Sequence, residues 1–187
     1  MTDAIISAGL PRSGSTLLYQ LIREVIRRHG ATFESVITKG AKATEDALRE
    51  ISQERAVDFV IVKTHAFHPS LAEHPMTRHI FTCFRDPRGM VASYIRLGWT
   101  FERALIPKAV PRRLQDLQKW EAAGAISFRY ERFFQWRAEA ARIICREIFG
   151  DDLSNETYQE IAAFCSLENH ENWKEIGRAS CRERVCH

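Results

Sequence analysis

Hydrophobic positions along the chain form short apolar runs that alternate with longer segments of helical periodicity. A short apolar run beside glycine is typical of a buried strand, whereas apolar residues spaced three and four apart are typical of one helix face. The runs predict four strands, at 4–8, 59–62, 79–84 and 125–130. The periodic segments predict helices at 16–28, 42–53, 87–97, 114–122, 133–149 and 155–164.

Strands that alternate with helices predict the α/β class, in a three-layer α/β/α arrangement with a central parallel sheet. The length of 187 residues suits one domain. Ligands of such folds bind at the carboxyl ends of the strands, so the residues that follow each strand are the first candidates for a site.

Composition and charge indicate which classes of partner and which cellular compartment suit the chain. A net charge of +3 is too small to indicate nucleic acid as the main partner. No apolar run is long enough to span a membrane, and the N-terminus has no signal-peptide pattern. Cys83, Cys145 and Cys165 stand alone in apolar surroundings, as reduced thiols do. We therefore expect a cytoplasmic protein; its oligomeric state cannot be inferred from the sequence.

The last twelve residues, IGRASCRERVCH, have neither a helical nor a strand period. They resemble the translated read-through of a sequencing adaptor; a genuine, disordered basic tail is the alternative. We expect a domain at 1–175, incomplete at its C-terminus, and a non-native tail at 176–187.

The segment GLPRSGSTLL links the first strand to the first helix. Backbone N–H groups at such a helix start bind phosphate. Gly9 and Gly14 allow a sharp turn, Arg12 adds a charge, and Ser15 and Thr16 add hydroxyl groups. A serine-rich turn that only caps the helix is the alternative.

The spacing of Gly9 and Gly14 matches the phosphate loop of nucleoside triphosphatases, but that motif requires lysine next. Ser15 occupies the lysine position. A P-loop kinase is therefore the disfavoured rival, which a magnesium requirement would support.

The segment CFRDPRGMVASY follows the third strand and has a second set of phosphate-binding groups. Arg85 stands at the strand end and Ser93 lies eight residues further on; a guanidinium and a hydroxyl group together suit a phosphate monoester. A surface ion pair is the alternative for Arg85. Asp86 is expected to cap the next helix, and Arg88 is either a ligand or a solvated residue.

The segment VIVKTH ends the second strand with Lys63 and His65. Imidazole suits removal of a proton near neutral pH. A metal site made of His65, His68, His74 and His79 is a weaker alternative because no carboxylate accompanies them.

Together these motifs resemble those of sulfotransferases that use 3′-phosphoadenosine 5′-phosphosulfate (PAPS), in family order and over about residues 4–170. PRSGST is similar to the 5′-phosphosulfate loop, RDPR with a following Ser to the 3′-phosphate segment, and KTH to the segment with the general base. ISFRYERFF resembles the strand whose Tyr lies near the adenine. The arginine at position 12 is shared with many bacterial members.

The resemblance implies a sulfotransferase fold related to P-loop nucleoside triphosphatases, and a role for each matched residue. The catalytic residues would be His65 as the base, with Arg12 and Lys63 beside the transferring group. The cofactor-binding residues would be Arg12, Ser13, Gly14, Ser15, Thr16, Arg85, Ser93 and Tyr130.

The implied reaction moves a sulfuryl group from PAPS to a hydroxyl or amine acceptor without a metal. The acceptor cannot be identified, although Gly98 to Arg113 is expected to line its site. Two family features are missing: Leu17 stands where cytosolic members often have Trp, and the late Arg-Lys-Gly segment is absent. A non-catalytic nucleotide-binding remnant is therefore a third alternative.

Overall fold

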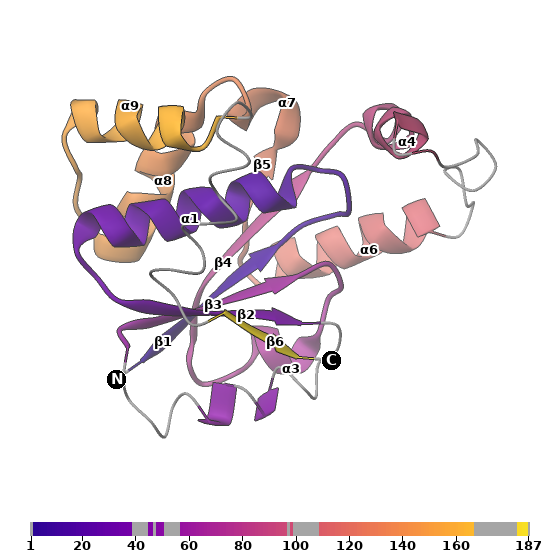
Figure 1. The fold of residues 1–187 in the computed structure, drawn as a ribbon. Helices are drawn as coiled ribbons and strands as arrows, with labels where there is room; N and C mark the ends of the chain where they lie inside the picture. Colours follow the sequence, from indigo (N-terminus) through magenta and orange to yellow (C-terminus); the bar gives the residue numbers. More distant parts are fainter. Residues whose placement is uncertain are drawn as a thin grey trace.

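A computed structural model describes residues 2–38, 45–46, 48–50, 57–96, 98, 109–166 and 183–186. Its centre is a six-stranded sheet in the order β5-β4-β1-β3-β2-β6, and every neighbouring pair is parallel (Figure 1). The strands are β1 Asp3–Ala8, β2 Phe33–Thr38, β3 Phe59–Thr64, β4 Thr77–Phe84, β5 Ile126–Arg129 and β6 Glu183–Cys186.

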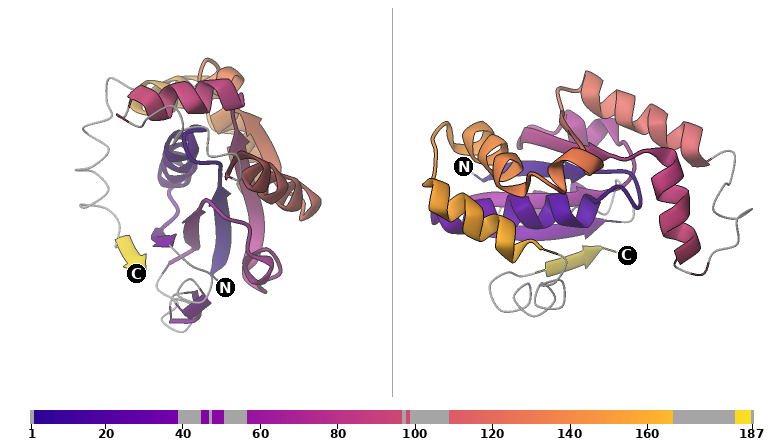
Figure 2. Two further views of the ribbon diagram at one scale, coloured as in Figure 1. Left: turned by 90° about the vertical axis from the view of Figure 1, so that its right-hand side faces the viewer. Right: turned by 90° about the horizontal axis from the view of Figure 1, so that it is seen from above.

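Helices cover both faces of the sheet, which gives three layers. Figure 2 shows α1, α8 and α9 together on one face. The helices are α1 Ser15–His29, α3 Pro69–Ala72, α4 Pro87–Arg96, α6 Ala109–Ala122, α7 Tyr130–Phe133, α8 Arg137–Phe149 and α9 Asn155–Phe164.

Each face of the sheet has its own core because successive strand side chains point to opposite sides. On β1, Ile5 packs in the cluster that contains Leu18 of α1 and Ile144 of α8. Its neighbour Ile6 packs in a second cluster, with Leu71 of α3 and Trp120 of α6. The predicted three-layer fold with a parallel sheet is thus confirmed.

The predicted elements match the observed ones with a few differences. Strand β2 was not predicted, and the single helix expected at 133–149 is divided into α7 and α8. Tyr130 begins α7 instead of ending β5. Of the helix expected at 42–53, the structure describes only 45–46 and 48–50, which are helical. No described helix is long and apolar enough to cross a membrane.

Part of the expected tail lies beside the sheet. Glu183–Cys186 forms the parallel edge strand β6, with Ser35 opposite Glu183 and Thr38 opposite Cys186. The segment has no alternating pattern, so the sequence predicts no strand here. Backbone pairing at an edge does not require one. That the tail is non-native stays a prediction.

Parallel strands bring the predicted motifs to one edge of the sheet. Strands β1, β3, β4 and β5 end at Ala8, Thr64, Phe84 and Arg129. The residues that follow directly are the glycine loop (residues 9–14), His65, Arg85 and Tyr130. In a parallel sheet, carboxyl ends share one edge, so segments distant in sequence meet there.

Candidate active site

The loop between β1 and α1 is held in an unusual backbone conformation. Gly14, the residue before α1, has φ 88°, and Arg12 is the one non-glycine residue of the described chain with positive φ, at 64°. A Cβ atom on Gly14 would lie 2.4 Å from the Tyr130 ring. Only glycine therefore allows Tyr130 to pack against the loop. Strain of the Arg12 kind is concentrated at functional sites.

Ser13 faces the interior and does not line the pocket described below. Its hydroxyl donates to the carbonyl of Leu10 at 2.6 Å, with the carbonyl of Cys83 at 3.1 Å. Burial raises the pKa of the Cys83 thiol to about 12, so this neighbour stays protonated. Ser13 thus holds the loop to β4, and its expected role in cofactor binding stays a prediction.

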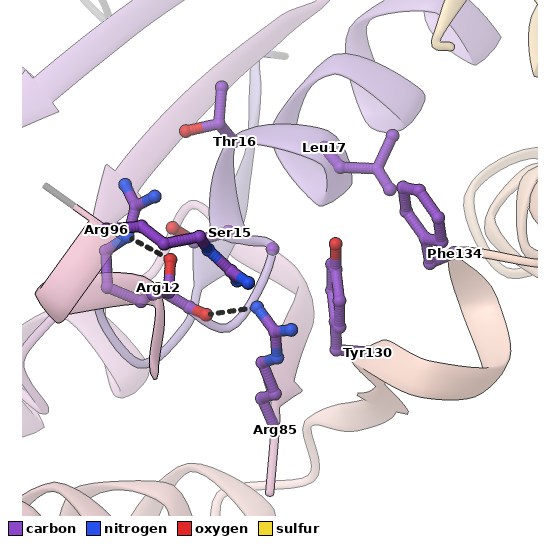
Figure 3. A pocket seen from close by; sticks show the side chains of 10 residues that line it. Arg12, Ser15, Thr16, Leu17, Arg85, Arg96, Tyr130 and Phe134 are labelled. Atoms are coloured by element: carbon purple, nitrogen blue, oxygen red, sulfur yellow. Dashed lines mark hydrogen bonds between the residues drawn. The ribbon is translucent and has the colours of Figure 1, made fainter. Parts of the chain in front are cut away.

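A cavity of about 360 Å³ opens at the carboxyl edge of the sheet (Figure 3). The loop between β1 and α1 contributes to it, together with α4 and α7. Its lining residues are Arg12, Gly14, Ser15, Thr16, Leu17, Arg85, Ser93, Arg96, Tyr130 and Phe134. In Figure 3, Arg12 and Arg96 lie opposite Leu17 and Phe134. One side of the pocket is thus cationic and the other apolar.

The two predicted phosphate motifs meet in this pocket. Arg12 Nε donates to Ser93 Oγ at 3.0 Å, although the two residues are 81 positions apart. Arg85 Nη1 approaches the carbonyl oxygen of Arg12 at 3.5 Å, and its guanidinium lies 4.2 Å from the centre of the Tyr130 ring. These contacts orient two cations and one hydroxyl group toward the same space.

A carboxylate accompanies Arg85 at the pocket margin. Glu131 Oε1 lies 4.0 Å from Arg85 Nε and accepts a hydrogen bond from the Asp86 amide at 3.1 Å. Burial raises the pKa of Glu131, but backbone hydrogen bonds and the hydrogen bond from Arg129 outweigh it, and the pKa is lowered overall. Glu131 is therefore ionised at neutral pH and partly offsets the charge of Arg85.

Asp86 caps α4 as expected. Its Oδ1 accepts a hydrogen bond from the Arg88 amide at 2.9 Å, and its carboxylate pairs with the Arg88 guanidinium at 2.6 Å. These bonds lower the pKa of Asp86 to about 2. The Arg88 side chain is 91% exposed and is not a lining residue of the pocket, which favours its solvated alternative.

Lys63 and His65 lie outside the pocket lining; Lys63 is bonded to the start of α1, and His65 to the loop before it. Lys63 Nζ donates to Thr16 Oγ1 at 3.1 Å. His65 Nδ1 lies 2.7 Å from the carbonyl oxygen of Gly9. A carbonyl can only accept, so Nδ1 carries the hydrogen and Nε2 of the neutral ring keeps its lone pair. This tautomer is the one that a general base at Nε2 requires.

Comparison with known proteins identifies the family. A family model described as a sulfotransferase domain matches residues 2–175. The chain belongs to the sulfotransferase family. The predicted resemblance is thereby confirmed, and the kinase alternative is not favoured.

The fold agrees with that of a solved structure, whereas no curated protein matches. The solved structure is retinol dehydratase in complex with androsterone and the inactive cofactor PAP, with a TM-score of 0.62. The match has 16% identity and covers 94% of this chain and 69% of that chain. At this identity the match shows the fold.

Two other histidines of the metal-site alternative, His74 and His79, have separate partners. His74 Nδ1 accepts a hydrogen bond from the Met76 amide at 3.3 Å, and His79 Nδ1 lies 3.4 Å from Glu147 Oε1. Within the described ranges, no group of three metal-ligating side chains is found.

Sequence reasoning missed two lining residues, Arg96 and Phe134. Arg96 is three positions beyond Ser93, a spacing that places both on one helix face and could have revealed it. Phe134 follows α7, where a long helix was expected, and its ring centre is 5.2 Å from that of Tyr130. Most of the expected acceptor segment, Gly98 to Arg113, lies outside the described residues.

Proposed function

We propose that this sulfotransferase transfers a sulfuryl group from PAPS to a hydroxyl or amine acceptor. The observation that carries the proposal is the hydrogen bond from Arg12 to Ser93, which joins the two phosphate motifs in one cationic pocket. PAPS supplies an activated sulfuryl group beside a 5′-phosphate and a separate 3′-phosphate. A pocket with groups for two phosphates suits this class of cosubstrate.

The pocket has the donors that such an anion needs. Gly14, Ser15 and Thr16 would bind the 5′-phosphate at the start of α1, where free N–H groups and the helix dipole favour negative charge. Arg85 and Ser93 would bind the 3′-phosphate.

The adenine would bind on the apolar side of the pocket. Tyr130 and Phe134 line this side with Leu17. Their ring centres are 5.2 Å apart, so they form one aromatic surface. Aromatic faces stack well on nucleobases, which supports a base contact here that does not need Trp at position 17.

His65 would act as the general base. Its Nε2 lone pair would accept the acceptor proton as the acceptor atom forms a bond to sulfur and the bond from sulfur to the bridging phosphate oxygen breaks. Arg12 and Lys63 would stabilise the negative charge that the leaving phosphate gains. The Lys63 contact to Thr16 supports this position.

Titration calorimetry tests the cosubstrate class. We expect 3′,5′-bisphosphoadenosine to bind at least about tenfold more tightly than adenosine 5′-phosphate, because one charge-assisted phosphate contact is worth about that factor. Equal affinities would contradict the proposal. A magnesium requirement for nucleotide binding would favour a kinase instead, and tight binding without any transfer would favour a non-catalytic module.

Three further expectations, on the domain bounds, the location and the partner, are also part of the proposal. The domain would span 1–175, which agrees with the end of the family match at residue 175. A cytoplasmic location is supported by the free, buried thiols of Cys83, Cys145 and Cys165. The partner would be an acceptor substrate of unknown identity and not a nucleic acid.

A further inference from the structure

Arg96 is a cation of the pocket to which none of the predicted motifs assigns a role. It is the last residue of α4 and lines the same cavity as Arg12 and Arg85. Figure 3 shows its side chain among those that line the pocket. Three guanidinium groups therefore line one space of about 360 Å³.

The helix places Arg96 next to the proposed 3′-phosphate group. Residues three apart on an α-helix are neighbours on its surface, so Arg96 shares a face of α4 with Ser93. Ser93 Oγ already accepts a hydrogen bond from Arg12, which leaves the Ser93 hydroxyl proton for a ligand oxygen. Arg96 is thus close to a hydroxyl group that can donate to an anion.

Charge balance favours a further cation there. A phosphate monoester carries a charge of about −1.5 to −2 near neutral pH. Arg85 faces the carboxylate of Glu131 at 4.0 Å, which offsets part of its positive charge. Within the described part of the chain, no carboxylate pairs with Arg96.

We propose that Arg96 binds the 3′-phosphate of the cosubstrate together with Ser93 and Arg85. This assignment rests on the proposed function and deepens it. A structural alternative exists, because a basic side chain in the last turn also stabilises a helix through its dipole. The two roles predict different results. A phosphate-binding role predicts a change in affinity for ligands with a 3′-phosphate, whereas a dipole role predicts a change in the stability of the protein.

The test compares Arg96→Ala with Arg88→Ala by calorimetry on the full chain, with two ligands. Arg88 is the matched control because it is on the same helix, is exposed and lies outside the pocket. We expect Arg96→Ala to weaken binding of 3′,5′-bisphosphoadenosine by about tenfold. Affinity for adenosine 5′-phosphate should stay within about twofold, and Arg88→Ala should change neither affinity by more than that.

Salt dependence and a conservative variant refine the test. The effect of Arg96→Ala should shrink at high ionic strength, because an exposed charge is screened. Arg96→Lys should recover part of the affinity, since it keeps the charge but not the planar guanidinium. A thermal melt of each variant reports the dipole contribution separately.

The outcomes separate this assignment from the proposed function. If the wild type prefers the bisphosphate and Arg96→Ala keeps that preference undiminished, the role of Arg96 is overturned and the proposed function stands. An equal loss for both ligands would also overturn the role. A wild type without any preference would overturn the proposed function, and the role of Arg96 with it.

Discussion

Arg12 Nε and Ser93 Oγ form a hydrogen bond of 3.0 Å at the carboxyl edge of the sheet. The bond joins the glycine loop after β1 to the helix after β4. A ligand that contacts both segments therefore meets donors whose relative positions are already set, which lowers the entropy cost of binding.

The first prediction concerns this bond. Ser93→Ala removes the hydroxyl group that lines the pocket and accepts the hydrogen bond from Arg12. We expect affinity for 3′,5′-bisphosphoadenosine to fall about tenfold in calorimetry, with little change for adenosine 5′-phosphate. Ser70→Ala, on the exposed surface of α3, is the control. An unchanged affinity in Ser93→Ala would remove Ser93 from the site.

The second prediction concerns the glycine that precedes α1. Gly14→Ala combines an unfavourable φ of 88° with a Cβ atom 2.4 Å from the Tyr130 ring, so the loop or the ring must move. Gly150→Ala is a matched control, since Gly150 has φ 74° and no atom near the added Cβ.

Both variants should lose about 1–2 kcal/mol of stability from the backbone alone. Only Gly14→Ala should lose more and also weaken nucleotide binding. A melting temperature and a nucleotide affinity that match those of Gly150→Ala would show that the contact between Gly14 and Tyr130 does not shape the pocket.

Most of the fold could be predicted from the sequence, but β2 could not. The segment Phe33–Thr38 contains Glu34 and Ser35, which are 4% and 1% exposed. Two adjacent buried polar residues conceal the apolar run that a buried strand usually shows. Only the contacts of the folded state reveal that such residues are interior.

The candidate site was predictable where a residue follows a strand end directly. Arg85 is such a residue, and so is Tyr130, although it begins a helix. Ser13 illustrates the limit, because its direction depends on the turn of the loop. A motif gives the order of residues but not which side chain points inward.

The third prediction concerns acid stability. The bonds from Arg88 lower the pKa of Asp86 to about 2, below its ordinary value of 3.8. A carboxyl group whose pKa is lowered by folding stabilises the protein at pH values above its pKa in the unfolded chain. That contribution is lost as pH falls from about 4 to about 2. The melting temperature of Asp86→Asn should therefore fall less over this window than that of the wild type. Parallel pH curves would contradict the cap.

The fourth prediction concerns the tail. Removing 176–187 should shift the melting temperature by less than about 4 °C, because the strand it removes has four residues and, among the described strands, only β2 as a neighbour. Both proteins should be measured with a reductant, since the tail contains Cys181 and Cys186. A clearly larger drop would show that the tail belongs to the fold.

The last prediction concerns the base. His65 is held by the Gly9 carbonyl with Nε2 as its basic atom. His65→Ala should therefore lower the transfer rate by about a hundredfold and leave the affinity for 3′,5′-bisphosphoadenosine nearly unchanged. His74→Ala is the control, because His74 bonds to Met76 away from the loop.

The most direct measurement is transfer of labelled sulfur from PAPS to a panel of hydroxyl and amine acceptors, with wild type and His65→Ala side by side. The account predicts a labelled product with the wild type, formed without added magnesium, and about a hundredfold less with the variant. Equal product from the two proteins would contradict the role of His65. No product from any acceptor, with the nucleotide still tightly bound, would contradict the proposed sulfuryl transfer itself.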